Sequence, residues 1–293
     1  RGLTQVAVSA QVVEKLKKSA KATPTSTPKA SPTTAAKPPS YQTPVAQKVA
    51  EPSIDFSKFN NPLEMKSEPK KAATLASVKK VELPKGDKKT QWEWLRQKVL
   101  SDEMILANVR KGKKAVFGVG NLDSPIFFCG EAPGAEEEEQ GEPFVGRAGQ
   151  LLTKIIEAMG VKREEVYIAN ILNYRPQMPD GSDVGNRPPT VEEMAGCLPY
   201  LKAQVEVVGP KAIIALGATA TTGLLGYDPD RKMGETRGKF YDFAGTPVMV
   251  TYHPSYLLRN NTNSAKRIVW EDFMAVMTKV GMPINEKQRK YFT

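Results

Sequence analysis

Residues 130–152 read GEAPGAEEEEQGEPFVGRAGQLL, and the rest of the chain is organised around this stretch. A continuous apolar strand is expected directly before it, at residues 126–129. An amphipathic helix is expected directly after it, with apolar residues at Leu151, Leu152, Ile155, Ile156 and Met159. In open α/β sheets, ligands collect at the carboxyl ends of strands, where glycines and helix N-termini admit them. The stretch therefore predicts an active-site rim, and the alternative is an acidic surface loop.

Charge and composition divide the chain into two regions. Residues 1–90 contain ten prolines and 17 Lys plus Arg against seven Asp plus Glu, which leaves 25 basic and 25 acidic residues for 91–293. The first region lacks the apolar surface to offset its ordering entropy, so a disordered tail is expected, with one short helix near Val6–Leu16. A folded domain is expected at 91–293. The basic tail fits an arm that binds nucleic acid through phosphate contacts, and equally a solubilising linker.

The sequence gives no sign of a membrane or secreted protein. No apolar run approaches the roughly 18 residues of a membrane span, and no secretory signal is visible. Two cysteines, Cys129 and Cys197, are too few for a disulfide framework or a metal cluster. A reducing, cytoplasmic setting is expected.

Strand and helix patterns alternate along the folded region, which predicts an α/β domain with a mostly parallel sheet covered on both faces. Helices are expected at 90–110, 190–208 and 264–280. The second of these opens with a capping box of Thr190 and Glu193. Buried strands are expected at 125–129, 166–172 and 212–216, with a short strand pair at 238–244 and 247–252. The last dozen residues are expected to be loose.

Several side chains fall at the expected carboxyl ends of strands. His253 is the only histidine and could stabilise negative charge on a leaving group, although a lone histidine is more often structural. Asn170 offers a donor and an acceptor that can read a pyrimidine edge, or it caps a turn. Phe144 can stack on a flat ring, or it belongs to the core. The helix that begins at Gly217, Ala218 and Thr219 presents free N–H groups to a phosphate.

Three stretches closely resemble the signature motifs of the family 4 uracil-DNA glycosylases: residues 130–152, NILNYRP at 170–176 and HPSYLLR at 253–259. FGVGN at 117–121 and MGETRG at 233–238 also resemble that family, and the similarity spans roughly 92–280. The resemblance implies a three-layer α/β/α fold with a central four-stranded parallel sheet. It also implies a DNA-repair hydrolase that cleaves the N-glycosidic bond of uracil flipped out of DNA and leaves an abasic site.

The resemblance implies roles residue by residue. Glu131 and Glu137 match acidic functional positions, and His253 matches the histidine near uracil O2. Phe144 matches the ring that stacks on uracil, and Asn170 matches the amide that reads it. Ala132 stands where the best-known uracil glycosylases have an aspartate. Gly134 stands where they place a tyrosine against the C5 methyl of thymine, so the resemblance does not explain how this chain excludes thymine. Contacts to the DNA backbone are expected from Gly217, Ala218, Thr219, Ser255 and Arg259.

The chain departs from the family at its iron–sulfur ligands. Family members hold a four-iron, four-sulfur cluster through four cysteines, and the matching positions are Ser101, Met104, Tyr174 and Cys197. One thiolate cannot hold a cluster, so none is expected. The loop at 177–185 is longer than is usual in the family and contains neither His nor Lys, which argues against covalent trapping of DNA. A catalytically weak DNA- or protein-binding module on the same fold is the alternative to an enzyme, and a monomer is expected.

Overall fold

The computed structural model describes residues 80–293. The expected tail and its short helix therefore lie almost wholly outside the described residues. The described part opens ahead of the expected boundary at residue 91, because helix α2 (Lys88–Leu100) begins at Lys88. Val81 and Leu83 pack against the apolar core, so the chain already contributes to the fold before that helix.

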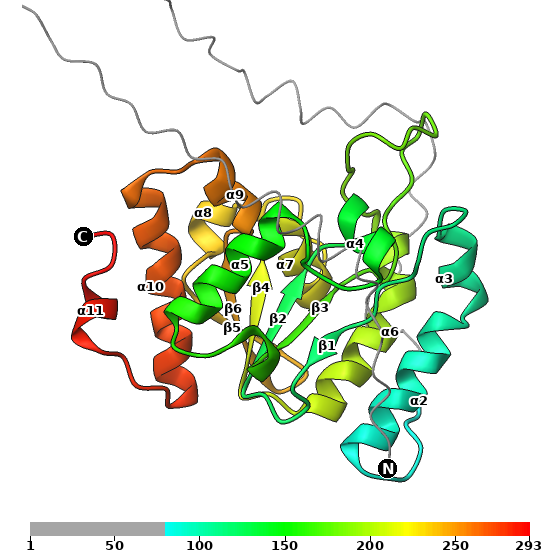
Figure 1. The fold of residues 1–293 in the computed structure, drawn as a ribbon, viewed down its shortest axis with the longest axis horizontal. Coiled ribbons are helices and arrows are strands. Elements are labelled where there is room, and N and C mark those ends of the chain that lie inside the picture. The colour runs from blue at the N-terminus through cyan, green and yellow to red at the C-terminus, as the bar shows by residue number, and fades with distance from the viewer. Residues whose placement is uncertain (1–79) are drawn as a thin grey trace, which may run out of the picture. The chain divides into compact units, whose positions relative to one another are not determined.

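The centre of the domain is a six-stranded sheet in the order β1-β3-β2-β4-β6-β5 (Figure 1). The four inner strands, β3 (Tyr167–Asn170), β2 (Ile126–Gly130), β4 (Ala212–Leu216) and β6 (Thr246–Thr251), are all parallel. The expected four-stranded parallel sheet is confirmed as the centre of a larger mixed sheet. β1 (Val119–Gly120) and β5 (Phe240–Phe243) add antiparallel edges. A two-residue strand such as β1 carries no sequence period, and it was not predicted.

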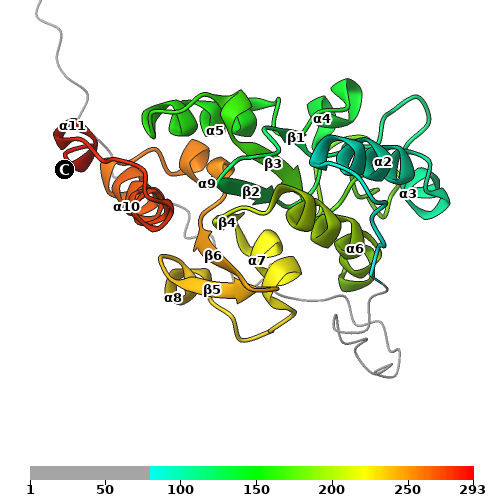
Figure 2. The same cartoon turned by 90° about the horizontal axis from the view of Figure 1, so that it is seen from below.

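Helices cover both faces of the sheet, which gives three layers (Figure 2). One face packs against α2, α6 (Val191–Val208) and α7 (Ala218–Leu225). The other packs against α5 (Arg147–Ala158), α9 (Pro254–Arg259) and α10 (Asn263–Val280). Successive residues of β2 alternate between the two cores, so a strand buried on both sides reads as one apolar run.

Three segments differ from the sequence-based expectations. The single helix expected at 90–110 is two helices, because Asp102 caps α3 (Glu103–Asn108) by accepting from the Ile105 N–H at 3.0 Å. The acidic run is not a loop but helix α4 (Ala135–Gln140), which ends at Gly141 with a left-handed φ of 79°.

The last residues are also more ordered than expected. They form α11 (Glu286–Arg289), where the Trp270 indole donates to the Gln288 carbonyl at 2.7 Å. The short elements η3 (Arg163–Glu165) and α8 (Met233–Thr236) complete the described fold. Within residues 80–293, none of the helices combines the length and apolarity that crossing a bilayer requires.

Candidate active site

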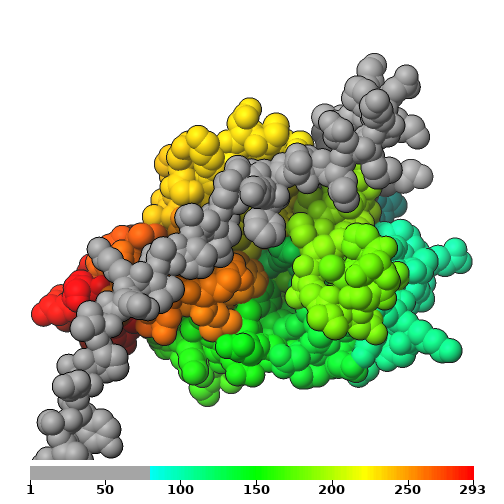
Figure 3. Space-filling model, turned by 90° about the horizontal axis from the view of Figure 1, so that it is seen from above, coloured from blue at the N-terminus to red at the C-terminus, as the bar shows by residue number. Residues whose placement is uncertain are grey.

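A cavity of about 500 Å³ opens at the carboxyl edge of the parallel strands. The strand register brings the ends of the strands level, with Gly130 opposite Asn170 and Leu216 opposite Thr251. Figure 3 looks onto this edge and shows a hollow between the orange segment with α9 and the light-green loop at 176–189. All eleven residues predicted for the site, from Glu131 to Arg259, line the cavity. The structure therefore brings the three sequence motifs together.

Phe144 forms one wall of the cavity and is held in an unusual backbone conformation. Its φ is 55°, in the left-handed region that bulky residues rarely adopt, and its side chain is 6% exposed. Two glycines make room for it. A Cβ at Gly130 would lie 2.4 Å from the Phe144 ring, and a Cβ at Gly149 would lie 1.9 Å from the Phe144 carbonyl oxygen. The surrounding structure thus fixes the ring in place.

The Glu137 carboxylate ties the Phe144 loop to α4. Its Oε1 accepts from the Val145 N–H at 3.0 Å and from the Gly146 N–H at 2.9 Å. Its Oε2 accepts from the Gly134 N–H at 3.0 Å, which caps the helix. Glu137 was predicted to be catalytic, yet the structure engages both of its oxygens with backbone. Two of these hydrogen bonds connect the carboxylate to the residues that directly follow Phe144.

Asn170 ends β3, and its side chain reaches into the cavity from the floor. The residue is 6% exposed, and its Oδ1 is buried without a hydrogen-bond partner. A Cβ at Gly130 would lie 2.4 Å from that oxygen, so the glycine keeps the space beside it open. Buried acceptors in folded proteins nearly always have a donor, and an unpaired one at a cavity marks a place for a ligand N–H.

His253 faces the same cavity as the cap of α9. The Ser255 N–H donates to His253 Nδ1 at 3.2 Å, and its hydroxyl lies 2.8 Å from the same nitrogen. Burial, reinforced by the nearby Arg259 charge, lowers the pKa of His253 to about 4. The neutral ring accepts at Nδ1 and therefore carries its proton on Nε2. Its ring lies 5.7 Å from the Phe144 ring, centroid to centroid.

Glu131 and the start of α7 form the remaining side of the cavity. Burial raises the pKa of the Glu131 carboxyl, and the Thr219 side chain partly opposes this. Gly217 precedes the helix with a φ of 91°, and a Cβ there would lie 3.0 Å from the His253 Cβ. Only glycine allows β4 and the His253 segment to approach so closely.

The loop at 176–189 closes the far side of the cavity, and sequence reasoning missed its contribution. Pro176, Asn186 and Arg187 line the cavity. Arg187 forms a bidentate pair with Glu193, with N–O distances of 2.7 and 2.6 Å, so its charge is already partnered. Pro176 ends the motif at 170–176, but no period or motif marks Asn186 and Arg187, because their placement depends on how the loop itself folds.

Three of the four expected cluster positions, Met104, Tyr174 and Cys197, lie close together, but their chemistry does not fit an iron–sulfur cluster. Met104 packs against Gly196, next to Cys197, and Tyr174 is buried beside that cysteine. Burial raises the pKa of the Cys197 thiol to about 12, so it keeps its proton. Ser101 is exposed at the end of α2. Within residues 80–293, no three His, Cys, Asp or Glu side chains form a group that could hold a metal ion.

A fixed aromatic ring, a carboxamide with an unpaired oxygen and a neutral imidazole form a cavity suited to a flat heterocycle. A model of the uracil DNA glycosylase superfamily matches residues 117–274. The chain belongs to the uracil DNA glycosylase superfamily.

Individual relatives agree with this placement. The Type-4 uracil-DNA glycosylase of Thermotoga maritima is 48% identical over 161 residues, which cover 54% of this chain and 78% of the relative. The corresponding enzyme of Archaeoglobus fulgidus is 35% identical over 181 residues, or 60% and 84% of the two chains. A Type-5 uracil-DNA glycosylase of Pyrobaculum aerophilum is 30% identical over 165 residues, or 51% and 68%.

Proposed function

We propose that this protein is a DNA-repair glycosylase that binds uracil flipped out of DNA and hydrolyses its N-glycosidic bond. The unpaired Asn170 Oδ1 is the observation that carries the proposal. Uracil N3–H is a donor of the kind that this oxygen needs, and the amide NH2 can donate to O4. The flipped base stacks on Phe144, which presents its ring at the same cavity.

His253 stabilises the departing base. A neutral imidazole with its proton on Nε2 can donate to uracil O2 as negative charge moves onto the ring. A preorganised donor of this kind is worth about 3–4 kcal/mol, or roughly a hundred- to thousandfold in rate. Because the pKa of His253 lies near 4, the ring is already neutral at physiological pH and acts as a hydrogen-bond donor, not as a general acid.

Glu131 is the carboxylate that faces the sugar and the attacking water. Glu137 is engaged by three backbone N–H groups, which leaves Glu131 as the carboxylate better placed for chemistry. A raised pKa suits a group that accepts a proton from water. In this assignment Glu131 stabilises the cationic sugar and activates water, while Ala132 leaves space beside it.

DNA is held by the helix N-termini around the cavity and by the basic N-terminal region. The N–H groups of Gly217, Ala218 and Thr219 open α7 at the rim, and Ser255 and Arg259 of α9 lie across from them. Residues 1–79 carry 13 Lys plus Arg against five Asp plus Glu and add sequence-independent affinity.

The protein works without an iron–sulfur cluster and as a monomer. In this proposal the buried Tyr174 beside Cys197, and Met104 against Gly196, take the place of the cluster. One chain supplies every residue of the proposed site, so no second copy is required. The two buried thiols, Cys129 and Cys197, suit a reducing cytoplasm.

A single-turnover assay on an oligonucleotide with one uracil, followed by alkaline cleavage of abasic sites, tests the enzyme against the binding module. The parent protein is expected to cleave. His253→Ala is expected to cleave about a hundred- to thousandfold more slowly with DNA binding little changed. Tight binding by the parent without any cleavage would instead support the non-catalytic module.

A further inference from the structure

We propose that Asn186 is the residue that excludes pyrimidines with a substituent at C5, and thymine above all. This inference rests on the proposed function, since it assumes that uracil occupies the cavity between Phe144, Asn170 and His253. Asn186 lies outside all three sequence motifs, in the loop that closes the far side of the cavity.

The order of atoms around the pyrimidine ring places C5 on the side of this loop. O2, N3, O4 and C5 follow one another around the ring. His253, which follows β6 and caps α9, takes O2 at one side of the cavity, and Asn170 at the end of β3 takes N3 and O4. Since β3 and β6 lie on opposite sides of β2 and β4 in the sheet, C5 points away from His253. In this proposal C5 lies beside Gly134 and Asn186, which line the cavity next to each other.

Gly134 has no side chain that could contact C5, and two polar groups lie beside Gly134. A Cβ at Gly134 would lie 2.7 Å from Glu137 Oε2 and 3.9 Å from Asn186 Nδ2. The Glu137 oxygen already accepts a hydrogen bond from the Gly134 N–H at 3.0 Å. The Asn186 amide comes from the opposite wall. It therefore closes the space into which a C5 methyl would extend.

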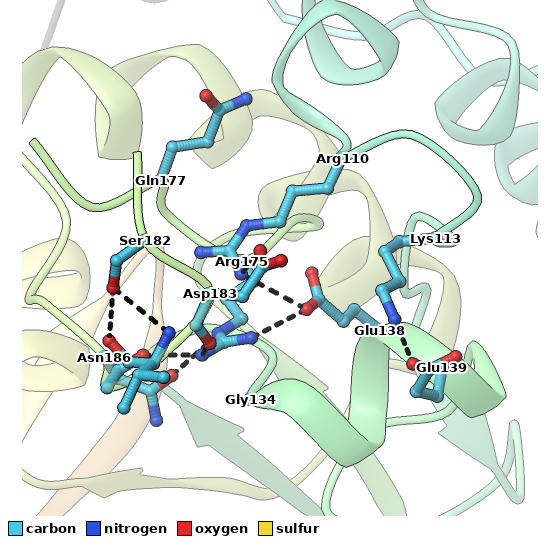
Figure 4. Close-up of polar contacts among 12 residues, drawn as sticks. Arg110, Lys113, Gly134, Glu138, Glu139, Arg175, Gln177, Ser182, Asp183 and Asn186 are labelled. Atoms are coloured by element: carbon cyan, nitrogen blue, oxygen red, sulfur yellow. Dashed lines mark hydrogen bonds and ion pairs between the residues drawn. The ribbon is translucent and has the colours of Figure 1, made fainter. Parts of the chain in front are cut away.

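A buried arginine fixes the Asn186 amide in one orientation. Arg175 Nε donates to Asn186 Oδ1 at 2.8 Å, so the amide NH2 is turned away from Arg175. The other Arg175 nitrogens donate to Glu138 Oε1 at 2.7 Å and to the carbonyls of Asp183 and Gly185 at 3.0 and 2.5 Å. Figure 4 shows Arg175 between Glu138 and the loop.

A second arginine also holds the loop that carries Asn186. Arg110 Nη1 lies 2.9 Å from Asp183 Oδ1 and 3.6 Å from Glu138 Oε1. Both Arg175 and Glu138 have side chains that are only 4% exposed. A thymine methyl would have to displace the Asn186 amide from its hydrogen bond with Arg175, or desolvate its NH2 group without a partner. Uracil carries only a hydrogen at C5 and avoids both penalties.

The test compares Asn186→Ala with Val184→Ala on single-stranded oligonucleotides that carry uracil, 5-fluorouracil, 5-bromouracil or thymine. Single strands remove differences in base pairing. Val184 is in the same loop but is 82% exposed and does not line the cavity, so it is the matched control. Dividing each variant's single-turnover rate by the parent's rate on the same substrate removes differences in leaving-group ability.

For Asn186→Ala, the relative rates on the bromo and methyl substrates are expected to exceed its relative rate on uracil at least tenfold, with fluorouracil between. Free thymine should also become a better competitive inhibitor of Asn186→Ala, while inhibition by free uracil is unchanged. The inference is overturned if Asn186→Ala changes the rates on all four substrates by one factor, or if Val184→Ala shows the same gain. A parent protein that releases no uracil would instead refute the proposed function.

Discussion

Replacing Glu137 by glutamine separates positioning from chemistry. The carboxylate accepts three backbone hydrogen bonds, at 2.9, 3.0 and 3.0 Å. Glutamine has nearly the same shape, but it offers one acceptor oxygen and turns an NH2 group toward the third N–H. Hydrogen bonds to charged groups are worth about 1.5–3 kcal/mol and neutral ones about 0.5–1.5 kcal/mol. Losing one hydrogen bond and weakening two therefore lowers the stability of this arrangement by about 3 kcal/mol. We use the low end of both ranges because Glu137 is only half-buried.

That free energy is what holds Phe144 at its left-handed φ of 55°. Glu137→Gln is therefore expected to lower the melting temperature, to weaken competitive inhibition by free uracil, and to slow single-turnover excision by about a hundredfold, at 1.4 kcal/mol per factor of ten. Glu136→Gln, at the exposed neighbouring position, is the control. Slow excision by Glu137→Gln with the parent's stability and uracil inhibition would refute this reasoning and return Glu137 to a direct catalytic role.

Three further predictions concern charge and cofactor. The pKa of His253 is about 4 in the folded protein and about 6.5 in an unfolded chain, so the unfolded state takes up the proton first as the pH falls. The parent should lose up to about 3 kcal/mol of unfolding free energy relative to His253→Asn between pH 6.5 and 4, and parallel urea curves for the two proteins would contradict the assignment. Removing residues 1–79 should weaken DNA binding and flatten its salt dependence, while single-turnover cleavage at saturating enzyme stays nearly unchanged. Much slower cleavage at saturating enzyme would show that these residues take part in the chemical step. Purified protein should be colourless and active, because Ser101, Met104 and Tyr174 supply no thiolate, and a visible absorption band with about four irons per chain would show a cluster.

The sheet and the meeting of the three motifs were predictable because both depend on local patterns. Apolar runs identify strands buried on two faces, and parallel strands bring their carboxyl ends to one edge. Asn170, His253 and the 130–152 stretch each follow such a run, so their convergence needed no knowledge of long-range contacts. The antiparallel pair of β5 and β6 corresponds to the strand pair predicted at 238–244 and 247–252, whereas β1 was missed because it is only two residues long.

The roles of individual carboxylates were not predictable from sequence. An acidic run reads as a solvated loop, yet Glu137 caps α4 and holds a backbone segment eight and nine residues further on. Its partners are backbone N–H groups, which every residue except proline has, so the pattern of side chains carries no signal. The same holds for Asn186, whose place in the cavity depends on the fork of hydrogen bonds from Arg175.

Asn170→Asp tests the central claim most directly, because it changes which base the cavity can read. Aspartate keeps an acceptor for N3–H, but it places an anionic oxygen against uracil O4 where the amide NH2 had donated. The measurement is the release of free base by parent and variant from single-stranded oligonucleotides that carry one uracil or one cytosine in the same context. We expect the parent to release only uracil. Asn170→Asp is expected to release uracil roughly a hundredfold more slowly and to release cytosine weakly, because the cytosine amino group can donate to the new acceptor. Full uracil release by Asn170→Asp would contradict it.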